Sequence, residues 1–282
     1  MKLEPHKVVS QQEWTTARKA LLKKEKESSK LLDQLAEERR KLPWVKVTKD
    51  YVFDAPGGAK VKLADLFGRH SQLVVYHFMF GPDWKEGCPS CSYVSDHNNA
   101  TLPHLGARDV SYVAISHAPM AKLEAFKKRM GWNFQWVSAY HTDFNQDYHV
   151  SFSKEETAKG KVYYNYEETE FPSEEGPGLS VFYKNEAGEI FHTYSTFGRG
   201  LDILLGTYRI LDMVPKGRDE EELPFGMAWL RYHDRYENSG GDQKFADADM
   251  PYWPVSSPEE VANGGCGCAS GSAKKSKEEA LA

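Results

Sequence analysis

Several stretches of the chain have the hydrophobic pattern of buried strands and helices. Residues 71–80, SQLVVYHFMF, are continuously apolar over the length of a strand, as are residues 110–116, VSYVAIS. A continuous apolar run indicates a strand that is covered on both faces, as in the centre of an α/β sheet. Residues 118–131 have apolar positions near helical spacing and end at Gly131, a typical helix stop. Residues 133–140 alternate between apolar and polar side chains and predict another strand.

The second half of the chain predicts a hairpin and a further helix. Residues 179–198 contain two strand-like runs around an Asn-Glu-Ala-Gly turn, and residues 200–215 predict an amphipathic helix that ends at Pro215. A long aromatic-rich insertion lies around residues 143–178, and residues 226–236 are the one helical candidate that follows. This order of elements predicts an α/β sandwich with a mixed central sheet flanked by helices.

The chain opens with a long polar helix. Residues 11–41 are rich in Ala, Leu, Lys and Glu, with apolar residues near both ends and a polar gap at residues 23–29. We expect this helix to pack at both ends and to be solvated between them. Residues 1–45 then form an N-terminal helical extension, and residues 46–240 form the α/β domain. Residues 241–282 form a C-terminal extension whose low-complexity end we expect to be disordered.

The composition of the chain indicates which classes of partner to expect and in which cellular compartment the protein works. The 282 residues carry 36 basic and 41 acidic side chains, and the net charge of −5 argues against nucleic acid or an anionic membrane as a partner. No apolar run approaches the roughly 20 residues of a membrane span, and the first residues lack the apolar core of a signal peptide. We therefore expect a cytoplasmic protein. In a reducing compartment, a close pair of cysteines is more often redox-active or metal-binding than structural.

Two of the four cysteines occur as Cys88-Pro89-Ser90-Cys91, shortly after the first apolar run. A thiolate at a helix N-terminus is stabilised by free backbone N–H groups and by the helix dipole, which lower its pKa. Pro89 suits the first helical position because no N–H is needed there. The order strand, loop, Cys-Pro-Ser-Cys and helix predicts a redox-active dithiol. Cys88 would be the outer, attacking thiolate, and Cys91 the deeper, resolving thiol.

Other interpretations of the cysteines stay open at this point. The pair could be two small packed residues, or half of a zinc site that needs two further ligands. With His192 in the predicted hairpin, it could instead hold a soft metal. The thiols of Cys266 and Cys268, in the glycine-rich tail, could pass electrons to the first pair, capture a soft metal or have no function. We expect His77, inside the first apolar run, to be a hydrogen-bonded core residue.

These motifs resemble the thioredoxin superfamily, in its thioredoxin-like and peroxiredoxin-like branch. Residues 51–80 look like the peroxiredoxin opening, Trp84 falls where thioredoxins carry a tryptophan, and residues 178–194 look like the thioredoxin hairpin. Residues 87–152, with the phrases RMGWNFQWVS and DFNQDYHVSF, are similar to a bacterial thioredoxin-like family known as domain of unknown function 899. The resemblance covers residues 10–240 and implies a thioredoxin-like fold without an established reaction.

Two positions depart from the pattern of the superfamily. Gly178 takes the place of the cis-proline that holds substrate backbone in thioredoxins, and Pro177 lies one position earlier, so the resemblance does not imply docking of an extended peptide. Lys85 takes the place of the typical peroxiredoxin threonine. Three arginines are candidates for stabilising a peroxide oxygen: Arg108, Arg129 and Arg199.

We therefore expect a thioredoxin-like thiol–disulfide oxidoreductase, or a thiol-dependent reductase or peroxidase, that uses no cofactor and no metal. Cys88 and Cys91 would carry the reaction, supported by Trp84, Pro89 and Gly178. The partners would be a disulfide or peroxide substrate and a cellular thiol reductant, and the sequence is compatible with a homodimer. The rival hypothesis is a thioredoxin-fold binding protein without turnover, which holds a soft metal or a protein partner.

Overall fold

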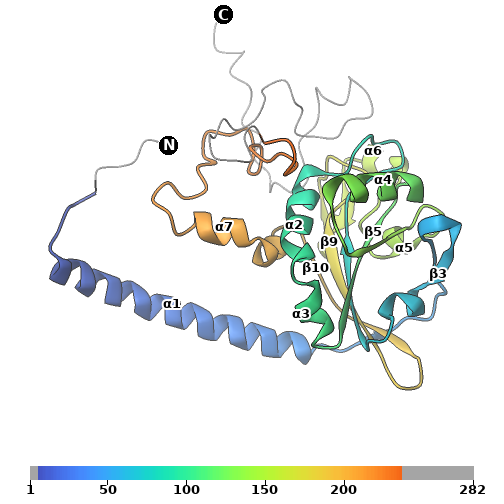
Figure 1. Ribbon diagram of the computed structural model, residues 1–282, viewed down its shortest axis with the longest axis horizontal. Helices are drawn as coiled ribbons and strands as arrows, with labels where there is room; N and C mark the ends of the chain where they lie inside the picture. Colours follow the sequence, from blue (N-terminus) through green and yellow to red (C-terminus); the bar gives the residue numbers. More distant parts are fainter. Residues whose placement is uncertain (1–5, 237–282) are drawn as a thin grey trace, which may run out of the picture.

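The computed structural model describes residues 6–236, which form an eight-stranded mixed sheet with helices on both faces (Figure 1). The strand order across the sheet is β1-β10-β9-β4-β5-β6-β2-β3. These strands are β1 (Val45–Lys46), β2 (Val52–Asp54), β3 (Lys60–Lys62), β4 (Gln72–His77), β5 (Val110–Ser116), β6 (Gln135–Ser138), β9 (Gly178–Lys184) and β10 (Ile190–Phe197).

Strand β4 lies in the middle of this sheet. It pairs in parallel with β5 and antiparallel with β9, and β5 pairs in parallel with β6. Strands β9 and β10 form the predicted hairpin, in whose turn the Gly188 N–H donates to the Asn185 carbonyl (2.9 Å). The order β5-β4-β9-β10, with helix α2 (Pro89–Asn99) following β4, is the thioredoxin-like arrangement. The fold class predicted from the sequence is therefore confirmed.

Both faces of β4 are buried, as its continuous apolar run predicts. Leu73 and Val75 belong to one hydrophobic cluster, and Tyr76 and Phe78 belong to the other. Because successive side chains of a strand point to opposite faces, this one strand contributes to two cores. His77 is also buried, and its Nε2 lies 2.8 Å from the Ser180 hydroxyl, so the expectation of a hydrogen-bonded core histidine is confirmed.

The described part of the chain contains several helices, and not all of them contribute to these two clusters. They are α1 (Gln11–Arg40), α2 (Pro89–Asn99), α3 (Leu102–Gly106), α4 (Met120–Met130), α5 (Phe144–Asp147), α6 (Lys154–Ala158) and α7 (Gly206–Leu211), with 3₁₀ turns η1 (Pro56–Gly58), η2 (Leu63–Phe67) and η3 (Gly198–Leu204). Helices α2 and α4 place Val94 and Leu123 in the cluster of Tyr76, whereas η2 and α5 place Leu66 and Phe144 in the cluster of Leu73. Within residues 6–236, no helix is long and apolar enough to cross a membrane.

Two helices predicted after the hairpin differ from the structure. The helix expected over residues 200–215 is broken at Leu205, whose φ of −98° and ψ of 82° are not helical, so η3 and α7 are separate pieces. Residues 226–236 form turns and irregular backbone instead of a helix. Leu230 and Tyr232 of this segment are buried in the core of the domain, and this long-range packing decides the local conformation.

Helix α1 forms as predicted, but it does not pack at both ends. It starts with a capping box between Ser10 and Glu13 and contains no buried residue. Near its C-terminal end, Arg39 lies over the Tyr194 ring, 5.7 Å from its centroid. The rest of the helix extends away from the sheet (Figure 1). The expectation of two packed ends is therefore wrong, because the domain reaches only the C-terminal part of this helix.

The aromatic-rich insertion builds a small core of its own. It contains α5, α6 and a two-stranded hairpin of β7 (Val162–Tyr164) and β8 (Glu167–Thr169). Buried side chains of Val150 and Phe152 pack there with β7 and with Phe197 at the end of β10. The insertion thus extends the domain at the end of the sheet where β9 begins.

Candidate functional site: a buried dithiol at the start of helix α2

Cys88 and Cys91 lie at the N-terminus of α2, where the sequence places them. Cys88 is the N-cap residue, Pro89 opens the helix and Cys91 lies in its first turn. The Ser92 N–H donates to the Cys88 carbonyl (2.9 Å), which starts the helical hydrogen bonds, and the Cys88 N–H donates to the Met79 carbonyl (3.0 Å). The second bond ties the dithiol to the end of β4. Neither cysteine forms a disulfide in this structure.

The two thiols are equally deep in the protein. Cys88 is 0% exposed and Cys91 is 1% exposed, so the expectation that Cys88 is the outer residue of the pair is wrong. Burial opposes formation of a thiolate, whereas the N–H groups of the first helical turn favour it. At this site the helix N-terminus and the burial of the thiols therefore act in opposite directions.

A cavity of about 20 Å³ lies beside Cys91. Its lining residues are Tyr76, Ser90, Cys91, Val94, Pro177, Gly198, Leu201, Asp202, Leu205 and Met227. A volume of this kind holds about one water-sized molecule. The cavity brings together α2, the start of β9 and the 3₁₀ turn η3, which are far apart in the sequence.

Pro177, and not Gly178, faces this cavity. Gly178 is the first residue of β9 and pairs with His77 of β4. A Cβ atom at Gly178 would lie 2.7 Å from Phe197 Cδ1 and 3.2 Å from Val150 Cγ1. Gly178 is thus required by the packing of the insertion and not by contact with the thiols.

The chain segment of residues 225–236, here called the covering segment, closes the site from outside. The Tyr232 hydroxyl donates to the carbonyl of Gly87, the residue before Cys88 (2.7 Å). The Tyr232 ring packs edge-on against Phe126 of α4, with centroids 5.5 Å apart. Burial raises the pKa of Tyr232, with the nearby Glu86 carboxylate and Cys88 adding to the effect.

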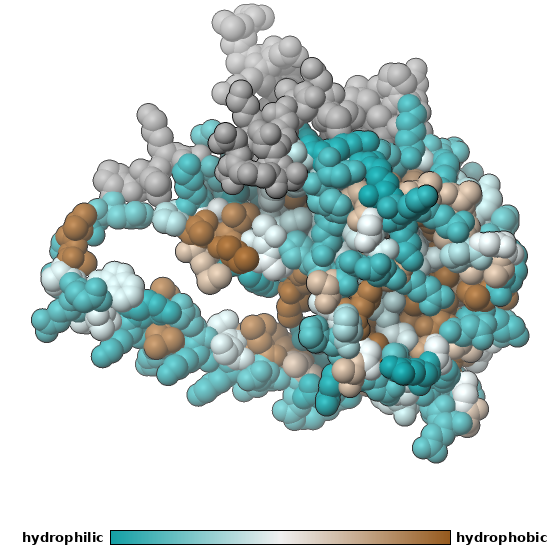
Figure 2. Space-filling model, viewed as in Figure 1, coloured by the Kyte–Doolittle hydropathy of each residue, from teal (hydrophilic) through white to brown (hydrophobic). Residues whose placement is uncertain are grey.

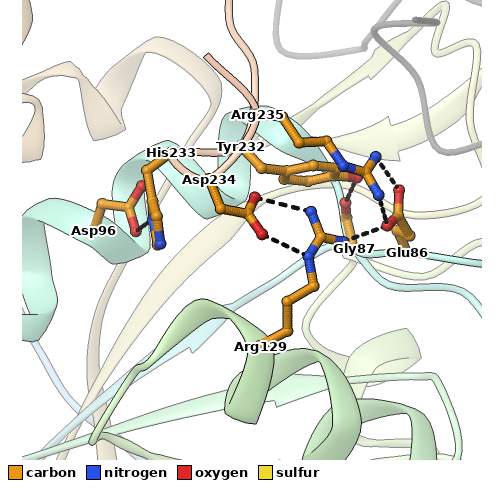
Figure 3. Close-up of polar contacts among 8 residues, drawn as sticks. All are labelled: Glu86, Gly87, Asp96, Arg129, Tyr232, His233, Asp234 and Arg235. Atoms are coloured by element: carbon orange, nitrogen blue, oxygen red, sulfur yellow. Dashed lines mark hydrogen bonds and ion pairs between the residues drawn. The ribbon is translucent and has the colours of Figure 1, made fainter. Parts of the chain in front are cut away.

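An ion-pair cluster fastens the covering segment to the dithiol loop (Figure 3). Glu86 accepts hydrogen bonds from Arg129 of α4 and from Arg235, whose Nη1 lies 2.8 Å from Glu86 Oε2. Arg129 also binds both carboxylate oxygens of Asp234, at 2.7 and 2.9 Å. Hydrogen bonding to Arg129 lowers the pKa of Asp234. The two guanidinium groups flank the Tyr232 ring, at 4.9 and 5.1 Å from its centroid.

Three arginines were candidates from the sequence for stabilising a peroxide oxygen, and one of them, Arg129, belongs to this ion-pair cluster. Arg129 reaches the dithiol loop, but its charge is shared between Glu86 and Asp234. Arg199 is exposed and pairs with Asp202, one of the cavity residues. Arg108 is exposed.

The other expected supporting residues lie in the loop between β4 and α2. Trp84 is half-buried against the core, and a Cβ atom at Gly81 would lie 2.8 Å from its Nε1. The Trp84 carbonyl accepts a hydrogen bond from Lys122 Nζ (2.9 Å). Lys85 is exposed. The loop is therefore held by its backbone and by the Trp84 ring.

The described part of the chain contains no group of three or more His, Cys, Asp or Glu side chains placed to hold a metal. His192, the expected third ligand for a soft metal, packs against Phe182 and Tyr148. Phe182 belongs to the cluster opposite that of the thiols, so the sheet separates His192 from Cys88. Cys266 and Cys268 lie outside the described residues.

Sequence reasoning missed the residues that close the site. Tyr232 binds Gly87 and Arg235 binds Glu86 across 145 and 149 positions of sequence, and no short-range pattern encodes such contacts. The available signal was the unusual density of aromatic and arginine residues in residues 226–236.

Comparisons with known proteins find similar solved structures and one family. Solved structures similar to this one include a peroxiredoxin Q of Xanthomonas campestris, with 14% identity, a TM-score of 0.37, and coverage of 57% of this chain and 90% of that chain. Another is the peroxidoxin BcpB of Mycobacterium tuberculosis, with 14% identity, a TM-score of 0.39, and coverage of 60% and 97%. Among curated proteins there is no match. The family model described as "Bacterial protein of unknown function (DUF899)" matches residues 3–236, and the chain belongs to this family.

Proposed function

We propose that the protein is a thiol-dependent reductase of small hydroperoxides, with Cys88 and Cys91 as its redox couple. The observation that carries this proposal is the placement of Cys88 at the N-cap and Cys91 in the first turn of α2, with a cavity of about 20 Å³ beside Cys91. A helix N-terminus favours the thiolate that attacks, and the spacing of three positions lets the second sulfur close a disulfide.

The proposed reaction has two steps. In the first, the Cys88 thiolate attacks one peroxide oxygen, the O–O bond breaks, and the other oxygen takes up the proton that Cys88 released on ionising and departs as water or an alcohol. Cys88 is thereby oxidised to a sulfenic acid. In the second, the Cys91 thiol attacks that sulfur, the S–O bond breaks, and water leaves as the Cys88–Cys91 disulfide forms. Two equivalents of a cellular thiol then reduce the disulfide and are themselves oxidised.

The size of the site favours a peroxide over a protein disulfide. Both thiols are at most 1% exposed, and the adjacent cavity has room for about one water-sized molecule. Hydrogen peroxide is only slightly larger than water. A disulfide on a protein surface would have to displace the covering segment, with its Tyr232 and Arg235 contacts, before its sulfur met Cys88.

A reducing compartment such as the cytoplasm supplies the thiol that completes the cycle. Cys266 and Cys268 are candidate auxiliary thiols in this last step, because a chain of about 30 residues links Tyr236 to Cys266. Their participation would make the reductant part of the same chain.

The test uses the full chain, with hydrogen peroxide and insulin disulfide as separate substrates and dithiothreitol as the reductant. We expect wild type to consume peroxide and to leave insulin reduction at the uncatalysed rate of dithiothreitol. Cys88→Ser should lose peroxide turnover by at least a hundredfold. When dithiothreitol is left out, Cys91→Ser should consume one equivalent of peroxide and accumulate a sulfenic acid at Cys88 that dimedone traps.

The matched control is the double variant Cys266→Ser/Cys268→Ser, which removes two thiols outside the dithiol. With dithiothreitol it should keep the wild-type peroxide rate, since an external reductant replaces any role of the tail. Peroxide turnover that survives in Cys88→Ser would overturn the proposal. Stoichiometric metal in the purified protein, without turnover of either substrate, would favour a binding protein instead.

A further inference from the structure

Helix α1 presents an apolar stripe that nothing in the described part of the chain covers. The six large apolar side chains on this helix are 37–55% exposed: Trp14, Leu21, Leu22, Leu31, Leu32 and Leu35. At 100° per residue, Trp14, Leu21, Leu32 and Leu35 fall within about 60° of one another around the helix. The helix is about 45 Å long at 1.5 Å per residue, so this stripe is a long, narrow face.

A second apolar patch lies on the body beside α7. It consists of Ile203 (57% exposed), Ile210 (60%), Met213 (76%) and Val214 (42%). Figure 2 shows an opening between the α1 arm and the body, with hydrophobic residues on both of its sides. Monomeric proteins rarely leave apolar patches of more than a few hundred Å² exposed, and larger ones mark interaction sites.

The charges along α1 indicate what covers it. Residues 11–24 carry a net charge of +3, from Arg18, Lys19, Lys23 and Lys24 against Glu13. Residues 31–40 carry a net charge of −1. An antiparallel second α1 places each basic half beside an acidic half, whereas a parallel pair places the two basic halves together. Opposite charges in register select orientation in paired helices.

The apolar positions have the same antiparallel complementarity. One group lies between Trp14 and Leu21 and the other between Leu31 and Leu35, on either side of a polar middle. When a second α1 lies antiparallel and the pair is centred between residues 24 and 25, residues 14–21 of each copy lie beside residues 28–35 of the other. The two apolar groups of one helix then face the two apolar groups of its partner. In that register Lys24 of one copy lies near Glu25 of the other, so the polar middle is also matched.

We propose that two copies of this chain form a dimer through their α1 arms, each arm lying in the opening between the other copy's arm and α7. The ten apolar side chains of the two patches together expose an area on the order of the ~800 Å² that each partner of a standard interface buries. The dimer also covers the outer side of η3, where Leu201 lines the cavity beside Cys91 together with the next residue after η3, Leu205. The interface does not depend on the proposed chemistry.

Sedimentation equilibrium of the full chain under reducing conditions tests the dimer. We expect wild type at about 100 µM to have twice the chain mass of 32.0 kDa. Leu21→Glu/Leu32→Glu places two charges in the stripe and should raise the dissociation constant at least a hundredfold. Because α1 contains no buried residue, this variant should keep the body folded, which near-UV circular dichroism verifies.

The matched control is Thr16→Glu/Gln34→Glu, which adds the same charges on the opposite side of α1 and should remain a dimer. Ile210→Glu, on α7, should weaken the dimer at least tenfold. A wild-type chain that stays monomeric at 100 µM would overturn the proposal and point to residues 237–282 or another protein as the cover. A stripe variant that dimerises as strongly as wild type would overturn it as well.

Discussion

Gly87 lies where the dithiol loop meets the aromatic core. A Cβ atom at this position would lie 2.5 Å from Phe78 Cε1 and 2.8 Å from Phe78 Cζ, and 3.1 Å from Phe126 Cε1. Both rings are buried among other aromatic side chains and have little room to move. We therefore expect Gly87→Ala to lower the free energy of unfolding by about 1–3 kcal/mol, the usual effect of overpacking a core. Urea denaturation measures this loss.

Gly106→Ala is the control for Gly87→Ala. A Cβ atom at Gly106, the last residue of α3, would lie 3.7 Å from His70 Cε1, an ordinary contact. Replacing a helical glycine by alanine restricts the unfolded chain, so the free energy of unfolding should stay within about 0.5 kcal/mol or rise. Equal losses in the two variants would show that close packing at Gly87 is not the cause.

His77 makes the stability of the fold depend on pH. Burial lowers its pKa to about 3, from an ordinary value of 6.5. Between pH 6.5 and 3 the unfolded chain binds a proton at His77 that the folded chain does not. The free energy of unfolding therefore falls by about 1.4 kcal/mol per pH unit as the pH is lowered through this window. Above pH 6.5 both states are neutral at His77, and its contribution is constant.

Urea denaturation at several pH values measures that slope. His77→Gln should reduce the slope of the unfolding free energy against pH by about 1.4 kcal/mol per pH unit, the contribution of one proton. This holds whatever the effect of the substitution on stability at pH 7. Gly106→Ala, which changes no titratable group, is the control and should keep the wild-type slope. The assignment to His77 fails if its replacement leaves the pH dependence unchanged.

The covering segment packs against the dithiol loop through Tyr232. Tyr232→Phe removes only the hydrogen bond to the Gly87 carbonyl and keeps the packing of the ring against Phe126. A hydrogen bond of this kind contributes about 1 kcal/mol. If the segment must open before a reagent enters, the alkylation rate of Cys88 by iodoacetamide should rise about fivefold. Mass spectrometry of the Cys88 peptide measures this rate.

Tyr166→Phe is the matched control for that measurement. Its hydroxyl donates to the Ser195 carbonyl (3.0 Å), and its ring packs on Phe197 beside the insertion. Loss of this bond leaves the covering segment in place, so Cys88 should react at the wild-type rate. Equal acceleration in both variants would indicate general loosening of the fold and not local opening of the segment.

Elements with a strong local pattern were predictable from the sequence. The run at residues 110–116 coincides with β5, and Pro89 begins α2, because burial on both faces and a fixed proline φ are encoded locally. The break at Leu205 and the irregular path of residues 225–236 were not predictable, since distant side chains of the core decide them. For the same reason the position of the dithiol was predictable from the sequence, but its burial was not. The ion pair between Glu86 and Arg235, which joins the covering segment to the dithiol loop, was not predictable either.

The whole molecule divides into a packed body and an arm of different stability. The body has two hydrophobic clusters that share the sheet, whereas α1 has no buried residue. Amide protons in β4 and β5 should therefore exchange only through large-scale unfolding. A free helix is only marginally stable in water even when it is well capped, so amides of a lone α1 should exchange through local opening.

Hydrogen exchange at several protein concentrations should separate these two parts. If a second copy covers the stripe, protection of peptides from residues 11–35 should rise with concentration, while peptides from β4 and β5 stay unchanged. In Leu21→Glu/Leu32→Glu the protection of α1 should stay low at every concentration, and in Thr16→Glu/Gln34→Glu it should follow wild type. Protection of α1 that is high and independent of concentration would contradict the dimer, because a cover from the same chain needs no second copy.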